Sequence, residues 1–201
     1  MAIQTVLCGR GGPGMTYMDQ MATELRAFVE EARPYSHKGK VVSYIPELMR
    51  ANPHLLGITM VSSEGKEISA GDYQARFTLQ SISKVFSLAL ALMDRGVEEV
   101  FRYVGMEPTG DPFNSLQRLE QREPGKPLNP MINAGAILIA SLIRGKKAQD
   151  RVERLLSLIR EISGNPTISV NEQVYLSEKR TGDRNRAMAY LMKSEGVLRG
   201  N

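Results

Sequence analysis

A β-hairpin pattern followed by a long helical stretch is the feature that most constrains how this chain can fold. Apolar residues alternate over 56–60, and a Ser-Glu-Gly-Lys turn at 63–66 leads into a second strand-like stretch over 67–70. Two strands alone are marginally stable in water, so the hairpin needs further strands or covering helices. The periodicity after residue 80 indicates helices and loops, with helices expected over 81–94, 96–103, 133–143, 147–162, 170–178 and 183–195. We therefore expect an α/β (α+β) arrangement in which the hairpin begins a sheet and a helical region follows.

A surface helix should precede the hairpin. Apolar residues repeat at helical spacing over 18–31, and Pro34 ends the pattern. Residues 41–45 are strand-like, and Tyr44 opens a short stretch that runs to Arg50.

The helix expected over 81–94 opens on Ser81-Ile82-Ser83-Lys84, a Ser-x-x-Lys element. Residues three apart on a helix share a face, with Cβ atoms about 5–6 Å apart, so the Lys84 amine can fold back towards the Ser81 oxygen. A lysine accepts a proton from serine only if burial or a nearby positive charge lowers its pKa, and the apolar residues that follow can supply such surroundings. The element also occurs by chance, and a serine at a helix start is commonly a cap.

Composition limits the other function classes. With 42% hydrophobic and 24% charged residues in 201, the chain is typical of a soluble globular protein with one substantial core. Its net charge is +4, and the basic residues of the last third are interleaved with acidic ones, as on a solvated helix surface. We therefore expect no nucleic-acid partner.

Cysteine and histidine usage predicts neither a disulfide nor a metal site. Cys8 is the only cysteine, and His37 and His54 stand in unrelated segments without a ligand pattern. The sequence contains no run of about 18 apolar residues and no signal-peptide pattern. We expect a cytoplasmic protein with no membrane partner.

Residues 9–14 satisfy the G-x-G-x-x-G pattern of dinucleotide-binding loops, after a strand-like stretch over 3–8. The pattern requires an acidic residue at the end of a second strand about 20 residues on. The next strand-like segment, 41–45, lies too far away and lacks that acid. We expect no nucleotide cofactor.

Five segments, in order, resemble conserved blocks of the serine-dependent glutaminase family. The first contains the Ser-x-x-Lys element, and the last contains a Ser-Glu-Lys-Arg-Thr-Gly-Asp-Arg-Asn run. Several ordered blocks at compatible spacing are far more specific than any one of them. The resemblance extends from about residue 15 to residue 201, and its blocks are 77–86, 104–110, 113–115, 127–137 and 177–185.

The resemblance implies the fold of the serine β-lactamases and penicillin-binding proteins, with a partial sheet and a helical domain. In that family later strands complete the sheet, so we expect this chain to be the N-terminal part of a catalytic domain. Residues 15–80 would supply the helix and hairpin of the sheet domain, and 81–201 the nucleophile helix and helical domain. Residues 1–14 would be a disordered N-terminal extension.

The activity implied is hydrolysis of L-glutamine to L-glutamate and ammonia, without metal or organic cofactor. Ser81 would attack the side-chain carbonyl and form an acyl-enzyme, with Lys84 as its catalytic partner. Free glutamine also carries an α-ammonium and an α-carboxylate, which require a carboxylate and amide or hydroxyl donors. By resemblance the substrate contacts are Tyr44, Gln80, Ser81, Asn133, Glu178 and Asn185.

Each of these residues also has a purely structural interpretation. Asn133 stands where a helix cap would sit, Asn185 could lie exposed in a helix capped by Asp183, and Glu178 could be a solvated charge. Tyr44 could pack against its neighbours, and the chemistry of Gln80 alone indicates little.

The oxyanion of the tetrahedral intermediate needs two donors, and the Ser81 backbone N–H can be the first. The resemblance places the second beyond residue 201, with further tyrosines, so the base could be Lys84 or a tyrosine. The family also implies a homo-oligomer, a dimer or a tetramer. Two alternatives stay open, namely another Ser-x-x-Lys acyl-transfer enzyme of the penicillin-recognising type, and a non-catalytic chain that associates with a full-length homologue.

Overall fold

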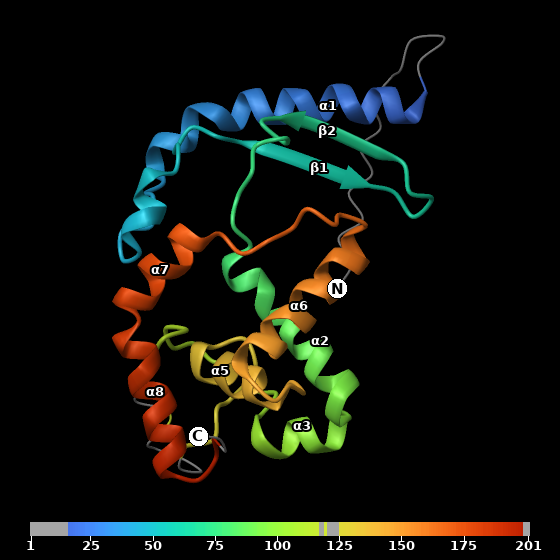
Figure 1. The fold of residues 1–201 in the computed structure, drawn as a ribbon. Coiled ribbons are helices and arrows are strands. Elements are labelled where there is room, and N and C mark those ends of the chain that lie inside the picture. Colours follow the sequence, from blue (N-terminus) through green and yellow to red (C-terminus); the bar gives the residue numbers. More distant parts are fainter. Residues whose placement is uncertain (1–15, 117–118, 120–124, 199–201) are drawn as a thin grey trace. The chain divides into compact units, whose positions relative to one another are not determined.

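The computed structural model describes residues 16–116, 119 and 125–198 (Figure 1). It divides into two compact units, residues 1–77 and 78–201. The predicted N-terminal extension, its G-x-G-x-x-G loop and Cys8 lie outside the described residues.

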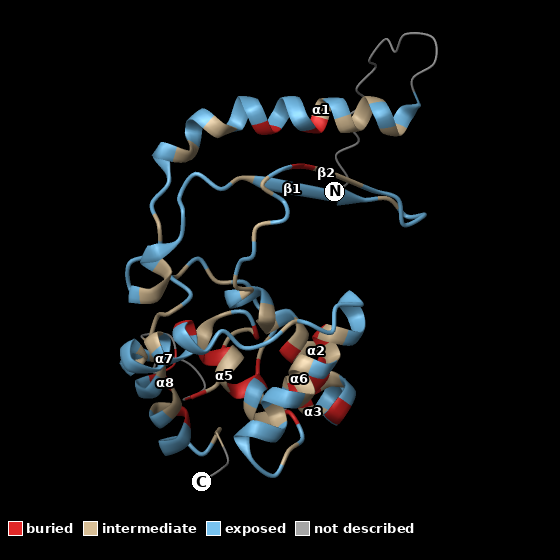
Figure 2. Ribbon diagram, turned by 45° about the horizontal axis from the view of Figure 1, so that its top comes forward, coloured by how far each residue is buried: buried red, intermediate tan, exposed pale blue. Residues whose placement is uncertain are grey.

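Helix α1 (Tyr17–Ala32) confirms the first predicted helix. It begins at a capping box, in which the Thr16 hydroxyl accepts from the Asp19 N–H and the Asp19 carboxylate accepts from the Thr16 N–H. Its buried side chains Leu25 and Val29 pack with Ala70 of the hairpin. Figure 2 shows short buried stretches on α1 and β2 of an otherwise largely exposed unit. A 3₁₀ helix, Arg33–Lys38, follows.

The hairpin is also confirmed. Strands β1 (Gly57–Val61) and β2 (Glu67–Gly71) pair antiparallel, with Ile58 opposite Ala70. They form a two-stranded sheet, and every residue of β1 is exposed while β2 buries Ala70 against α1.

The strand-like prediction for residues 41–45 is wrong. The segment forms no strand, and a 3₁₀ helix, Pro46–Arg50, begins directly after it. Pro46 occupies the first turn of that helix, where its missing N–H costs nothing. Ile45 is buried at 2% exposure, so its apolar character reflects packing rather than strand pairing.

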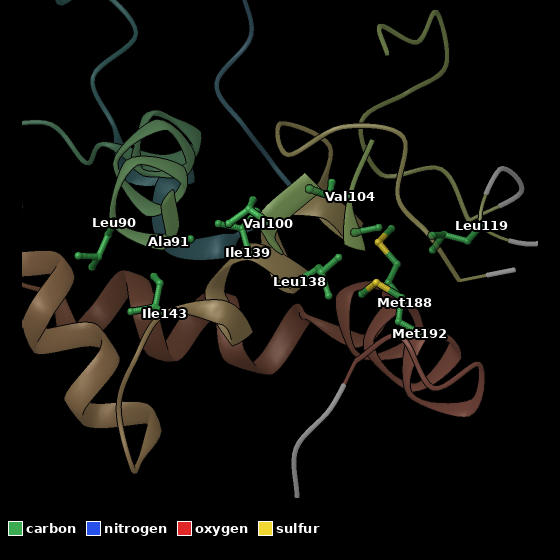
Figure 3. Close-up of a cluster of buried hydrophobic side chains, with 11 residues drawn as sticks. Leu90, Ala91, Val100, Val104, Leu119, Leu138, Ile139, Ile143, Met188 and Met192 are labelled. Atoms are coloured by element: carbon green, nitrogen blue, oxygen red, sulfur yellow. The ribbon is translucent and has the colours of Figure 1, made fainter. Parts of the chain in front are cut away.

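The second unit is helical among the described residues. Its α-helices match the predicted ones to within three residues at each end. They are α2 (Ser83–Arg95), α3 (Val97–Tyr103), α5 (Asn133–Leu142), α6 (Ala148–Ser163), α7 (Glu172–Thr181) and α8 (Asp183–Ser194). The core gathers apolar side chains from α2, α3, α5 and α8, including Ala91, Val100, Leu138 and Met188 (Figure 3). No α-helix among the described residues is long and apolar enough to cross a membrane.

A buried carboxylate fixes the C-terminal end of α2. Asp94 is 7% exposed and accepts from Arg154 Nη2 of α6 at 2.7 Å and from the Arg144 backbone N–H at 2.7 Å. The Arg154 guanidinium holds the pKa of Asp94 below its usual range. The neighbouring Arg95 donates from Nε to the Leu142 carbonyl at 2.9 Å. These contacts join the C-terminal end of α2 to α6 and to the C-terminal end of α5.

Candidate active site

Ser81 lies in a tight turn before α2 rather than on the α-helix itself. The turn is a 3₁₀ helix, Gln80–Ile82, and the serine is exposed. Gln80 has a φ of 45°, in the left-handed region that residues other than glycine rarely adopt. The α-helix predicted over 81–94 begins only at Ser83, after this turn. Ser81 does not cap α2, because Ile82 holds the N-cap position without a side-chain bond.

Two hydroxyl-bearing neighbours hold this turn. Ser83 donates from Oγ to the Gln80 carbonyl at 2.7 Å. The Gln80 side chain donates from Nε2 to Thr78 Oγ1 at 3.2 Å. Local polar contacts therefore support the left-handed residue directly before the serine.

Lys84 stands in the first turn of α2 and is partly buried. Its Nζ donates to the Met131 carbonyl at 2.8 Å and to Asn133 Oδ1 at 2.8 Å. The same nitrogen lies 5.8 Å from the centroid of the Phe113 ring. Burial lowers the pKa of the Lys84 amine, because desolvation disfavours its charged form.

Asn133 is the first residue of α5, and its side chain does not cap the helix. The capping interpretation is wrong, because Ile132 holds the N-cap position and no side chain caps the helix. In the turn before α5, Asn129 Oδ1 accepts from the N–H groups of Met131 at 2.9 Å and Ile132 at 3.2 Å. The Asn133 amide accepts from Lys84 and donates from Nδ2 to Asn185 Oδ1 at 3.0 Å. Its backbone N–H donates to the Phe113 carbonyl at 2.8 Å.

Asn185 lies in the first turn of α8 and is partly buried rather than exposed. Gly182, not Asp183, holds the N-cap position of α8, so the predicted capping by Asp183 is wrong. The next residue back, Arg184, donates from Nε to the Asn114 carbonyl at 2.6 Å and ties α8 to the loop that carries Phe113. The structure thus brings Lys84, Asn133 and Asn185 together.

Glu178 and Tyr44, two further predicted substrate contacts, stand on other segments of the chain. Glu178 is on α7, close to its C-terminal end, and is exposed. Tyr44 belongs to the first unit, where its side chain is 63% exposed. The sequence did not predict that the Met131 carbonyl accepts from Lys84, because every residue type carries a backbone carbonyl.

The family model for glutaminases matches residues 39–201. The chain belongs to the glutaminase family. Glutaminase 2 of Clostridium perfringens is 54% identical over 181 residues, which are 90% of this chain and 59% of that relative. The match therefore spans about three fifths of the length of that glutaminase.

Solved glutaminase structures confirm the fold expected from the resemblance. A probable glutaminase of Bacillus subtilis superposes with a TM-score of 0.80 at 41% identity, covering 90% of this chain and 55% of that one. A Bacillus subtilis glutaminase solved as a covalent complex with 5-oxo-L-norleucine, formed by reaction with 6-diazo-5-oxo-L-norleucine, gives a TM-score of 0.75 at 36% identity, covering 90% and 56%. The predicted fold class is correct: a serine β-lactamase-like α/β protein with a partial sheet and a helical domain.

Proposed function

We propose that this glutaminase-family protein hydrolyses L-glutamine to L-glutamate and ammonia, with Ser81 as the nucleophile and Lys84 as its base. The observation that carries the proposal is the environment of Lys84, one turn after the serine. Its amine is partly buried, and two oxygens accept from it. A deprotonated lysine has two N–H groups and one lone pair. The Met131 carbonyl and Asn133 Oδ1 would take the two N–H groups, which leaves the lone pair for the serine hydroxyl.

In the first step Ser81 Oγ attacks the side-chain carbonyl carbon of glutamine while its proton passes to Lys84. The Ser81 backbone N–H would donate to the oxyanion. Lys84 then returns the proton to the leaving nitrogen, the C–N bond breaks and ammonia departs. Water, deprotonated by the same amine, attacks the acyl carbon. The ester bond to Ser81 Oγ then breaks, Lys84 returns the proton to Oγ, and L-glutamate leaves.

The same proposal assigns the substrate contacts. Glu178 would bind the α-ammonium, and the Asn133 and Asn185 amides would donate to the α-carboxylate. Tyr44 and Gln80 would complete the contacts with the substrate. The joined amides of Asn133 and Asn185 support this assignment, because they lie beside the amine that would activate Ser81.

The covalent complex of the Bacillus subtilis glutaminase also supports a nucleophilic mechanism. Its ligand arose by reaction of that protein with 6-diazo-5-oxo-L-norleucine. A diazoketone forms such a bond when a protein nucleophile displaces nitrogen gas. In this chain we assign that reaction to Ser81.

Location and assembly are further parts of the proposal. We propose that the protein acts in the cytoplasm as a homo-oligomer, a dimer or tetramer, without a nucleic-acid partner. Light scattering on the protein as it leaves a size-exclusion column would measure its molar mass. The molar mass of a monomer at micromolar concentration would contradict the proposed homo-oligomer.

Ammonia release and covalent labelling together test the activity. The purified 201-residue chain and its Ser81→Ala variant are incubated with L-glutamine or L-asparagine, and ammonia is measured. In a separate experiment both proteins react with 6-diazo-5-oxo-L-norleucine, and peptide mass mapping locates the label. We expect glutamine-selective ammonia release and a label on Ser81, both lost in the variant. Glutamine turnover that survives Ser81→Ala, or a label on another residue, would disprove the role of Ser81. An absence of both release and labelling would contradict the activity of this chain.

A further inference from the structure

The hydrogen bonds between Lys84, Asn133 and Asn185 run in one direction. Lys84 Nζ donates to Asn133 Oδ1 at 2.8 Å, and Asn133 Nδ2 donates to Asn185 Oδ1 at 3.0 Å. All three side chains are partly buried, and they come from α2, α5 and α8. The three helices meet at this chain of donors.

The N–H groups of Lys84 fix that direction. Both the charged and the neutral amine can donate to the Met131 carbonyl and to Asn133, and the lone pair of the neutral form is left for the Ser81 hydroxyl, so the Asn133 atom that faces the amine must be the oxygen. The amide nitrogen of Asn133 then faces Asn185, and the Asn185 atom that faces this nitrogen must also be the oxygen. The Asn185 nitrogen, with two N–H groups, is therefore turned away from Asn133.

The opposite orientation would change what Asn185 can bind. An asparagine side chain can turn by 180° about its terminal torsion and exchange its oxygen and nitrogen at almost no steric cost. If Asn133 were turned, its oxygen would face Asn185, which would then direct its own nitrogen inward. Asn185 would present an acceptor and would favour a cation over a carboxylate.

We propose that Lys84, besides any role as a base, is a positioning residue that makes Asn185 an anion-binding group. The lysine orients Asn133, and Asn133 orients Asn185 so that its N–H groups are available to the α-carboxylate. This inference rests on the proposed function for the identity of the ligand, but the orientation itself does not. Lys84 thereby contributes to specificity for substrates with a free α-carboxylate.

The orientation is tested without ligand, by nuclear magnetic resonance of the asparagine side-chain amides. We compare the wild type with Lys84→Met, which removes the donor, and with Lys84→Arg, which retains a charged donor. Lys193→Met is the matched control, because Lys193 is an exposed lysine on α8, the helix of Asn185. We expect Lys84→Met to shift the Asn185 amide signals, Lys84→Arg to restore them in part, and the control to leave them unchanged. Asn185 signals that are identical in Lys84→Met and wild type would overturn the proposal.

The consequence for binding is tested with L-glutamate and L-isoglutamine in the Ser81→Ala background. These ligands differ only in the α-group, which is a carboxylate in the first and a neutral amide in the second. The background should prefer L-glutamate about ten- to a hundredfold, as expected for hydrogen bonds to a charged group. Adding Lys84→Met should reduce that preference, and adding Lys84→Arg should retain most of it.

The amide spectra and the ligand-binding measurements together distinguish a failure of this proposal from a failure of the proposed function. A structural role for Lys84 alone would weaken both ligands equally and leave their ratio unchanged, which would overturn the proposal. If the background binds neither ligand, the α-carboxylate assignment of the proposed function fails, while the amide signals still decide whether Lys84 orients Asn185.

Discussion

The partly buried amine of Lys84 makes stability depend on pH at the scale of one residue. Burial lowers the pKa of Lys84 in the folded chain from the 10.5 of a solvated lysine. Below its folded-state value the lysine is protonated in both states, and the folded chain carries the full desolvation cost. As the pH rises through that value, the folded chain releases the proton first, so the unfolded state binds more protons and the free energy of unfolding increases.

We therefore predict that the free energy of unfolding of the wild type, relative to Lys84→Met, rises as the pH approaches 10.5. Urea denaturation at a series of pH values would measure this difference. A difference that is constant, or that falls with rising pH, would show that the folded state does not disfavour the charged amine.

Backbone strain at Gln80 gives a second prediction at this scale. Its φ of 45° places a residue with a Cβ atom in the left-handed region, which costs about 1–2 kcal/mol. Gln80→Gly should be more stable than Gln80→Ala by about 1 kcal/mol, because both remove the side chain and only glycine removes the strain. Chemical denaturation of the two variants measures this, and equal stabilities would indicate that the turn relaxes without cost.

At the scale of elements, the first turn of α5 packs against the loop before it. Gly135 is buried, and a Cβ atom there would overlap the Asn129 carbonyl oxygen and lie 3.0 Å from Pro130 Cα. Asn133, two residues earlier, would move with this turn, and its hydrogen bond from Lys84 would be distorted.

Gly135→Ala should therefore destabilise the chain by about 1–3 kcal/mol, the usual range for overpacking. It should also perturb the Asn133 side-chain amide signals. Gly110→Ala is the matched control, since its Cβ would meet no atom within 4 Å and the glycine has no positive φ, so we expect a change within about 0.5 kcal/mol. Thermal denaturation and amide spectra measure both variants, and equal effects would refute the steric argument.

Periodicity predicted most elements because they bury one regular face. The helices of the second unit and the hairpin over 57–71 follow directly from their apolar spacing. The failures have local causes. A strand over 41–45 has no pairing partner among the described residues. The left-handed Gln80 opens a 3₁₀ turn that delays the start of α2 to Ser83, and Ile132 rather than Asn133 holds the N-cap position of α5. None of these causes is visible in apolar periodicity.

At the scale of the whole molecule, the candidate site depends on contacts between residues distant in sequence. Lys84 meets Asn133 across 49 residues, and Asn133 meets Asn185 across 52. Spacing within one element cannot predict such pairs, so only the family resemblance selected these three residues together. The direction of the hydrogen bonds among these three residues could be read only from the structure, because the sequence does not say which amide atom faces which neighbour.

The two units differ in how much apolar surface they bury, and their local stabilities should differ accordingly. The buried cluster beneath the hairpin contains Leu25, Val29 and Ala70, whereas that of the second unit gathers eleven buried residues. Local opening is easiest where few apolar contacts hold the backbone, and a two-stranded sheet has little stability of its own.

We predict that the amide protons of β1 exchange with solvent at least about a hundredfold faster than those of the central turns of α2 and α5, because opening the hairpin exposes far less apolar surface than opening the helical core. Hydrogen–deuterium exchange with peptide-level mass spectrometry measures both regions in the same sample. Peptides from α1 serve as the internal comparison, since Leu25 and Val29 pack with Ala70 of the hairpin and the helix should open with it. Protection of β1 equal to that of α2 would mean that the hairpin opens only together with the helical unit, so that the two compact units unfold as one cooperative body.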